Sequence, residues 1–159
     1  MRLSLWGRHA PLTLGLAVLT FVADQAHKWW MLHVYDIEGR GTVPLTAFFD
    51  LVMVWNRGVS YGLLATHAQG LLIALSLLIS AFLWRWAAMA RHRLTAAALG
   101  LVIGGALGNA LDRALHGGVA DFFHLHWGGW SWYVFNIADI AIVAGVGLLL
   151  YDSLRNGKA

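Results

Sequence analysis

The sequence predicts a mainly α-helical membrane protein with four transmembrane helices, a small extracytoplasmic β-sheet and an outer loop or arm. Composition is the first observation behind this prediction. Of the 159 residues, 59% are hydrophobic and only 12% are charged, whereas a soluble domain carries about 25% charged residues. The other two observations are four long apolar segments and the positions of the basic residues around them.

Four apolar segments are candidates for spans. They cover residues 11–31, 69–90, 94–115 and 134–154. Their uninterrupted apolar cores are about 15 residues long, shorter than the ~20 needed to cross a bilayer, so each helix must extend through polar residues at one end. The length fits one integral membrane domain, residues 1–159, with outer segments at 32–68 and 116–133.

Basic residues predict the orientation of these spans. Seven of the eleven Lys and Arg residues precede the first span, surround the turn between the second and third, or follow the fourth: Arg2, Arg8, Arg85, Arg91, Arg93, Arg155 and Lys158. Basic loops stay in the cytoplasm, so both termini are expected there. A cleaved secretory signal is the alternative for the N-terminus. It is disfavoured because Asp24 to Lys28 do not form a small-residue cleavage site.

In this topology, polar residues of three helices lie at one depth, just beneath the outer surface. They are Asp24, at the end of the first span, Asn109, Asp112 and Arg113, at the end of the third, and Asn136 and Asp139, at the start of the fourth. A carboxylate at the bilayer centre costs roughly 2.5–3.5 kcal/mol, and less near the interface. Residues carried at such a cost are candidates for a functional site.

The first outer segment is expected to form short strands over residues 42–66, where apolar and polar residues alternate. Asn56-Arg57-Gly58 is a turn signal at the end of this run. The Asn56 amide is placed to bond an extended peptide backbone. A plain turn asparagine is the alternative that its spacing favours.

The second outer segment predicts a β-hairpin. Gly128-Gly129 separates two aromatic-rich runs, which places Trp127 opposite Trp130. If the pairing continues outward in the same register, Asp121 lies opposite Asn136. Asp139 then follows Asn136 at i, i+3 on one helix face.

Two carboxylates in a site of low dielectric constant cannot both ionise easily. Asp121 and Asp139 would therefore share one proton, so one acid can activate water while the other protonates a leaving amine. No metal or covalent nucleophile is needed. In the alternative, both acids pair with Arg113 or cap helices. Capping is implausible for Asp139 if it lies about four residues inside the span. Asp112 and Arg113, adjacent in the sequence, could form a local ion pair.

Composition and spacing disfavour other sites. The pI near 9.7 comes from scattered bases without a nucleic-acid-binding motif, so no nucleic-acid partner is expected. Because the chain lacks Cys, thiolate catalysis and Cys-based metal sites are excluded. His124 and His126 form an H-x-H pattern, a weak metal signal. No further ligand pattern accompanies it, so surface histidines are favoured and no metal is expected.

Several short motifs together carry a resemblance to a known family. They are Asp24-Gln25 with Lys28, Asn56-Arg57-Gly58-Val59-Ser60-Tyr61-Gly62, Gly104-Gly105, Gly108-Asn109-Ala110-Leu111-Asp112-Arg113, Val119-Ala120-Asp121-Phe122 and Phe135-Asn136-Ile137-Ala138-Asp139. With these motifs in order along nearly the whole chain, the sequence closely resembles lipoprotein signal peptidase (signal peptidase II), the bacterial membrane aspartic protease.

The resemblance implies an activity and a set of site residues. The activity is cleavage of prolipoprotein signal peptides just before a diacylglyceryl-modified Cys, in the bacterial cytoplasmic (inner) membrane near its outer leaflet. Asp121 and Asp139 would be the catalytic pair. The supporting residues would be Asn109, Arg113 and Asn136, which position the substrate or the acids, and Asn56 and Asp24, which complete the site. A monomer in contact with membrane lipids and without a cofactor is expected.

The alternative function is a small transporter or proton pathway, in which intramembrane acids shuttle ions. A conduction path needs polar residues along the depth of the helices, and the inner halves of these spans are nearly bare. A haem or metal protein would need His within the spans, where His27 near one end is the only candidate.

Overall fold

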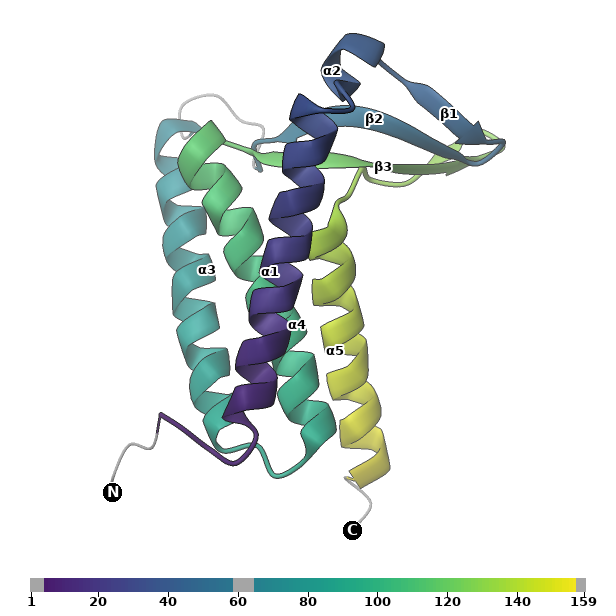
Figure 1. The fold of residues 1–159 in the computed structure, drawn as a ribbon. Coiled ribbons are helices and arrows are strands. Elements are labelled where there is room, and N and C mark those ends of the chain that lie inside the picture. The colour runs from purple at the N-terminus through teal and green to yellow at the C-terminus, as the bar shows by residue number, and fades with distance from the viewer. Residues whose placement is uncertain (1–4, 59–64, 157–159) are drawn as a thin grey trace.

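The computed structural model of the chain describes residues 5–58 and 65–156. Its elements, in chain order, are α1 (Ala10–His33), α2 (Ile37–Arg40), β1 (Val43–Thr46), β2 (Phe49–Asn56), α3 (Ala65–Ala88), α4 (Arg93–His116), β3 (Val119–Trp127), β4 (Trp130–Ser131) and α5 (Ile137–Asn156). The four long helices form a bundle, and the strands form one small sheet at one end of it (Figure 1). The predicted fold class is confirmed.

Three helices in the described residues are long and apolar enough to cross a membrane. They are Gln69–Ala88, Arg93–His116 and Ile137–Arg155. The remaining long helix, α1, has the same length as α4, 24 residues, but its second half contains Asp24, Gln25 and Lys28. Asp24 and Lys28 are only 0% and 3% exposed. These polar groups therefore face the protein, and α1 completes the bundle.

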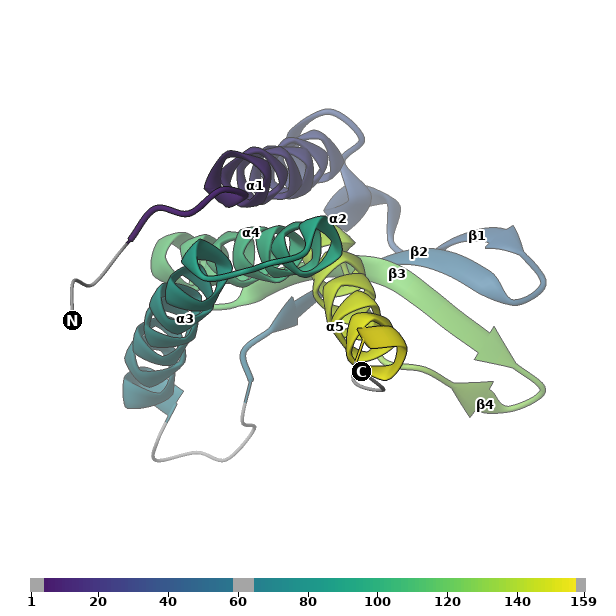
Figure 2. The same ribbon diagram turned by 90° about the horizontal axis from the view of Figure 1, so that it is seen from below.

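Helix α4 lies at the centre of the bundle and packs against α1, α3 and α5 (Figure 2). Two adjacent glycines allow its close contacts. A Cβ added at Gly104 would lie 2.5 Å from the backbone oxygen of Ala17 in α1, and one added at Gly105 would lie 2.5 Å from that of Ala138 in α5. These glycines therefore have a packing role, because any larger residue would push the helices apart.

The sheet is antiparallel, in the order β1-β2-β3-β4. It lies at the end of the bundle opposite to the start of α1 and the end of α5 (Figure 1). A buried cluster that includes Met31 of α1, Ile37 of α2 and Phe122 of β3 joins the sheet to the helices. Strand β3 follows α4 after two residues. The start of β3 therefore lies beside the polar residues at the C-terminal end of α4. Of the motif that begins at Asn56, residues 59–62 lie outside the described residues.

Candidate active site

The hairpin register decides how β3 meets the start of α5. Trp127 pairs with Trp130, as predicted. Further along, however, Phe123 pairs with Phe135, one residue out of step with the hairpin. The prediction that Asp121 lies opposite Asn136 in a continuous ladder is therefore wrong. The ladder between β3 and β4 covers only two residue pairs, His126 with Ser131 and Trp127 with Trp130.

The Asn136 side chain nevertheless bonds to Asp121. Its Nδ2 donates to Asp121 Oδ1 at 2.7 Å, and Asn56 Nδ2 donates to Asp121 Oδ2 at 3.1 Å. The Asn56 side chain also accepts a bond from the backbone N–H of Gly58 at 3.0 Å. The turn interpretation of Asn56 is confirmed, and the same amide also reaches an acid. That Asn56 bonds an extended peptide backbone stays a prediction.

Asp139 lies in the first turn of α5 and closes a capping box. The Asn136 backbone N–H donates to Asp139 Oδ2 at 3.2 Å, and the Asp139 N–H donates to Asn136 Oδ1 at 3.0 Å. The prediction that Asp139 has no capping role is wrong, because the helix begins at Ile137 rather than at residue 134. The other carboxylate oxygen, Oδ1, accepts a bond from Asn109 Nδ2 at 2.9 Å.

Two asparagine amides thus join the two acids. Asn136 Nδ2 also lies 3.1 Å from Asn109 Oδ1, so a chain of hydrogen bonds runs from Asp121 through Asn136 and Asn109 to Asp139. Each acid accepts a bond from an amide, which fixes the position of its carboxylate without neutralising it.

Asp121 is 1% exposed, so ionising its carboxyl group places a negative charge where water cannot solvate it. Burial first, and then the negative charge of Asp139, raise the pKa of Asp121 from 3.8 to about 6, against the opposing hydrogen bonds of Asn56 and Asn136. The cause is the one expected for two carboxylates in a desolvated site, where ionising one makes it harder to ionise the other.

Comparison with known proteins identifies the family of this chain. The sequence model of the family described as signal peptidase (SPase) II matches residues 16–155. The chain belongs to the signal peptidase II family. It is therefore a membrane peptidase of the aspartic type.

Individual relatives agree with this assignment. The chain is 52% identical to a lipoprotein signal peptidase of Methylocella silvestris over 158 residues, covering 94% of this chain and 90% of the relative. It is also 52% identical to a lipoprotein signal peptidase of Methylobacterium sp. (strain 4-46) over 149 residues, covering 91% of this chain and 90% of the relative.

Two solved structures described as bacterial membrane enzymes have the same fold. They superpose with TM-scores of 0.77 and 0.75, each at 25% sequence identity and over 91% of this chain, covering 93% and 88% of those chains. These likenesses extend the family assignment to the arrangement of the helices and the sheet.

A buried charged cluster supports the acids of this signal peptidase II. Lys28 Nζ lies 2.7 Å from Asp24 Oδ2 and 2.7 Å from Asp112 Oδ2. It also donates to Asn109 Oδ1 at 3.2 Å. Asp112 therefore pairs with Lys28, and the interpretation of Asp112-Arg113 as a local ion pair is wrong. Reading the sequence for site residues missed Lys28, although its i, i+4 spacing from Asp24 was a signal for it.

The acids of this cluster hold backbone groups next to the catalytic candidates. Asp24 Oδ1 accepts a bond from the Ala138 N–H at 3.0 Å, and Asp112 Oδ2 accepts one from the Ala120 N–H at 3.2 Å. Ala138 precedes Asp139, and Ala120 precedes Asp121. The cluster thereby fixes the backbone beside each acid.

Arg113 is half-buried beside the amides. Its Nη1 donates to the Asn109 backbone oxygen at 3.4 Å, and its Nε is buried without a hydrogen bond. In the part of the chain that the structure describes, no carboxylate oxygen lies within ion-pair distance of Arg113. The acids are thus held by amides, and the alternative in which they simply pair with Arg113 does not describe this site.

An apolar cavity of about 600 Å³ opens beside the acids, between the sheet and α5. Asn56 and Asp139 are its polar lining, and the rest is largely apolar or aromatic: Leu125, Trp132, Tyr133, Val134, Phe135, Ile140, Val143 and Ala144. A cavity of this kind accommodates an apolar ligand while presenting one carboxylate and one amide to it.

Proposed function

We propose that the chain removes signal peptides from diacylglyceryl-modified bacterial prolipoproteins, cutting before the lipidated Cys, with Asp121 and Asp139 as the catalytic acids. The single observation that carries this proposal is the hydrogen-bonded chain of Asn136 and Asn109 between the two carboxylates. It holds two acids together in a buried layer where a structural role alone would favour apolar residues.

In this mechanism, the two acids share one proton. The ionised acid takes a proton from water, and the resulting hydroxide attacks the scissile carbonyl carbon. The protonated acid then gives its proton to the leaving amine as the C–N bond breaks, so the dyad regains its single proton. The pKa of Asp121, which burial and the charge of Asp139 raise to about 6, supports a pair that holds a proton more readily than an ordinary carboxyl group does.

The cavity supports a mode of substrate binding. Its apolar walls suit the hydrophobic residues and the acyl chains of a lipidated peptide, and Asn56 at the end of β2 is placed to bond an extended backbone. Asp139, which lines the cavity, then meets the scissile bond. Asn109, Asn136, Asp24 and Arg113 position the acids from behind.

We place both termini in the cytoplasm and the acids near the outer leaflet of the inner membrane. Arg8 and Arg93 line a cavity at the end of the bundle away from the sheet, which fits the cytoplasmic bias of basic residues. The enzyme acts as a monomer of one integral membrane domain, in contact with membrane lipids. Both acids lie on the chain itself, so no second copy is needed to complete the pair.

The test is cleavage of a diacylglyceryl-modified prolipoprotein by the purified protein in detergent, compared with Asp121→Asn and Asp139→Asn. Both variants preserve side-chain size and can still accept a hydrogen bond, so both are expected to fold and to lose cleavage. Normal cleavage by either folded variant would reject that acid as catalytic. Failure of the folded native protein, beside an active relative, would reject the proposed substrate.

A further inference from the structure

Three side chains of metal-binding type meet on the outer sheet, away from the catalytic acids. Asp50 of β2 lies opposite His124 of β3 in the sheet register. His126 is two residues further along β3, and so shares the face of His124. One potential ligand atom from each side chain lies within 4.8 Å of the others. The sequence showed only the two histidines, because Asp50 comes from a strand more than 70 residues earlier.

The hydrogen bonds of His124 direct one ring nitrogen toward this group. Its Nε2 lies 2.7 Å from Ser131 Oγ, and the Ser131 hydroxyl donates to the Trp132 backbone oxygen at 3.4 Å. When the single proton of that hydroxyl is directed to Trp132, His124 Nε2–H donates to Ser131. Nδ1 then carries a lone pair, and it lies 3.7 Å from Asp50 Oδ2. A partner that fixes the tautomer in this way is typical of metal-ligating histidines.

His126 also brings a nitrogen to Asp50. Its Nε2 lies 2.9 Å from Asp50 Oδ2, yet this buried nitrogen makes no hydrogen bond within the described residues. The two atoms are close without a proton aligned between them. Two ligands about 2.0–2.2 Å from one tetrahedral ion lie about 3.3–3.6 Å apart, and the distances from Asp50 Oδ2 to the two histidine nitrogens, 2.9 Å and 3.7 Å, lie on either side of this range.

We propose that Asp50 Oδ2, His124 Nδ1 and His126 Nε2 bind a divalent transition-metal ion of the zinc class. Two imidazoles and one carboxylate suit Zn²⁺ and its neighbours. They do not suit Ca²⁺ or Mg²⁺, which prefer oxygen ligands. Three protein ligands leave a fourth position of a tetrahedral ion for water.

A simple ion pair explains the cluster less well. The two imidazole rings are stacked, with centroids 5.2 Å apart and planes inclined at 27°, and they share one carboxylate. Protonating both rings would place two positive charges side by side against a single negative one. An ion between the three groups instead satisfies both lone pairs and the carboxylate together.

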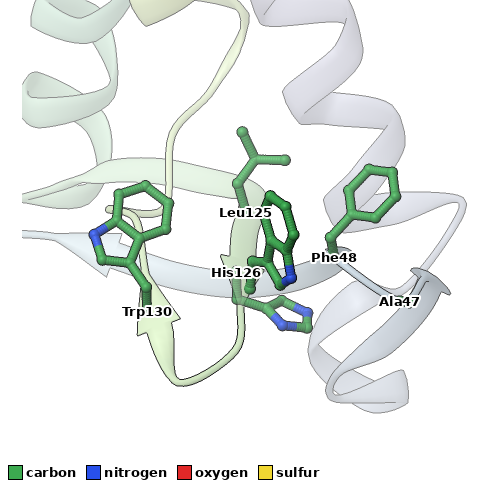
Figure 3. Close-up of a pocket in the computed structure, with 6 residues that line it drawn as sticks. Ala47, Phe48, Leu125, His126 and Trp130 are labelled. Carbon is green, nitrogen blue, oxygen red and sulfur yellow. The ribbon is translucent and has the colours of Figure 1, made fainter.

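The position of the cluster suggests a structural ion. His126 lines a second cavity, of about 520 Å³, whose other walls include Phe48 and Trp130 (Figure 3). This cavity reaches the cluster at His126. Strands β2 and β3 carry Asp50 and His124 at one end of their pairing, and Asn56 and Asp121 toward the other. An ion at the first end would stiffen the strands that hold the catalytic side chains.

The test uses full-length protein in detergent, purified through a tag without histidine and stripped with a chelator. We expect a titration with Zn²⁺ alone to show one bound equivalent and a raised Tm. His126→Gln and Asp50→Asn are each expected to weaken binding at least a hundredfold. Ser131→Ala should weaken it about 10–100-fold by freeing the His124 ring. His33→Gln, at the C-terminal end of α1 and outside the three-residue group, is the matched control and should bind as the native protein does.

Two results would overturn the proposal. One is a folded, peptidase-active native protein that binds no Zn²⁺ at micromolar concentration. The other is an affinity in His126→Gln equal to that of the native protein. Retained prolipoprotein cleavage shows that a variant is folded, because none of these side chains touches the catalytic acids. Co²⁺ gives a second readout: its visible absorption should appear with native protein and be lost in both ligand variants.

Discussion

Asn136 Nδ2 donates a hydrogen bond of 2.7 Å to Asp121 Oδ1, while the same side chain accepts the Asp139 backbone N–H at 3.0 Å. One asparagine therefore starts α5 and holds both acids. Asn136 thus sets both where α5 begins and how the two acids lie relative to each other. A change at Asn136 affects both, and different substitutions separate the two effects.

Asn136→Ser should separate capping from catalysis. Serine is also a favourable N-cap residue, so the free energy of unfolding is expected to fall by less than about 1 kcal/mol. Its short hydroxyl cannot reach Asp121 as the amide does, so kcat should fall at least tenfold. Asn136→Ala loses both functions and should cost a further ~1 kcal/mol of stability.

The measurements are prolipoprotein cleavage and thermal unfolding in detergent. Asp36→Ala provides the control. It removes the side-chain cap of α2, where Asp36 Oδ1 accepts the Gly39 N–H, far from the dyad. This variant is expected to keep native kcat. Native kcat in Asn136→Ser would show that the bond to Asp121 does not matter for catalysis.

Asp139→Glu tests whether Asp139 is more than a helix cap. Glutamate is a common residue at this position of a capping box, so the helix terminus and the Tm should be largely preserved. The extra methylene moves the carboxylate away from Asn109 and from the scissile bond. Because a positioned acid or base contributes about 10²–10⁴-fold, cleavage should fall by a factor in that range. A native cleavage rate for this variant would show that Asp139 has only a structural role.

The pH dependence of stability should report Asp121. Its pKa is raised from 3.8 to about 6 in the folded protein, so the folded state holds this proton more tightly than the unfolded chain does. The resulting stabilisation is complete below about pH 4 and is lost as the pH rises through 6. Thermal unfolding of native protein and of Asp121→Asn across this range should show a larger decline in the native protein than in the variant. An equal decline in both proteins would assign it to another group.

Features whose signal is local in the chain were predicted correctly. Long apolar segments predicted the long helices, and Gly128-Gly129 predicted the Trp127–Trp130 pair. The same analysis placed Asp121 near Asn136, although by a register that the structure does not keep. The side chains meet because Asn136 turns toward β3 as α5 begins, and no strand ladder is needed.

The errors concern details that depend on helix ends and long-range contacts. An apolar run does not reveal where the first helical hydrogen bond forms, so moving the start of α5 from residue 134 to Ile137 changed Asp139 into a capping residue. Lys28 was missed because its partner Asp112 is 84 residues away. The contact of Asp50 with His126 arises only from the pairing of β2 with β3.

Gly108 connects helix packing to the active site, and Gly108→Ala is expected to reduce cleavage without adding any polar group. A Cβ at this position would lie 2.7 Å from Asp24 Oδ2, so the Asp24 carboxylate must move. It would then lose its bond to the Ala138 N–H, which fixes the first turn of α5 beside Asp139. A displacement of about 1 Å at a reacting group can cost on the order of a hundredfold in rate.

Gly147→Ala is the matched control for this prediction. It makes the same substitution in α5, but an added Cβ there meets no atom within 4 Å. Because alanine favours a helix over glycine by about 1 kcal/mol, this variant should keep the native rate and gain Tm. Gly108→Ala should therefore lower the cleavage rate, whereas Gly147→Ala should leave the rate unchanged and raise the Tm. If Gly108→Ala cleaves at the native rate, the Asp24 carboxylate is not what positions Asp139.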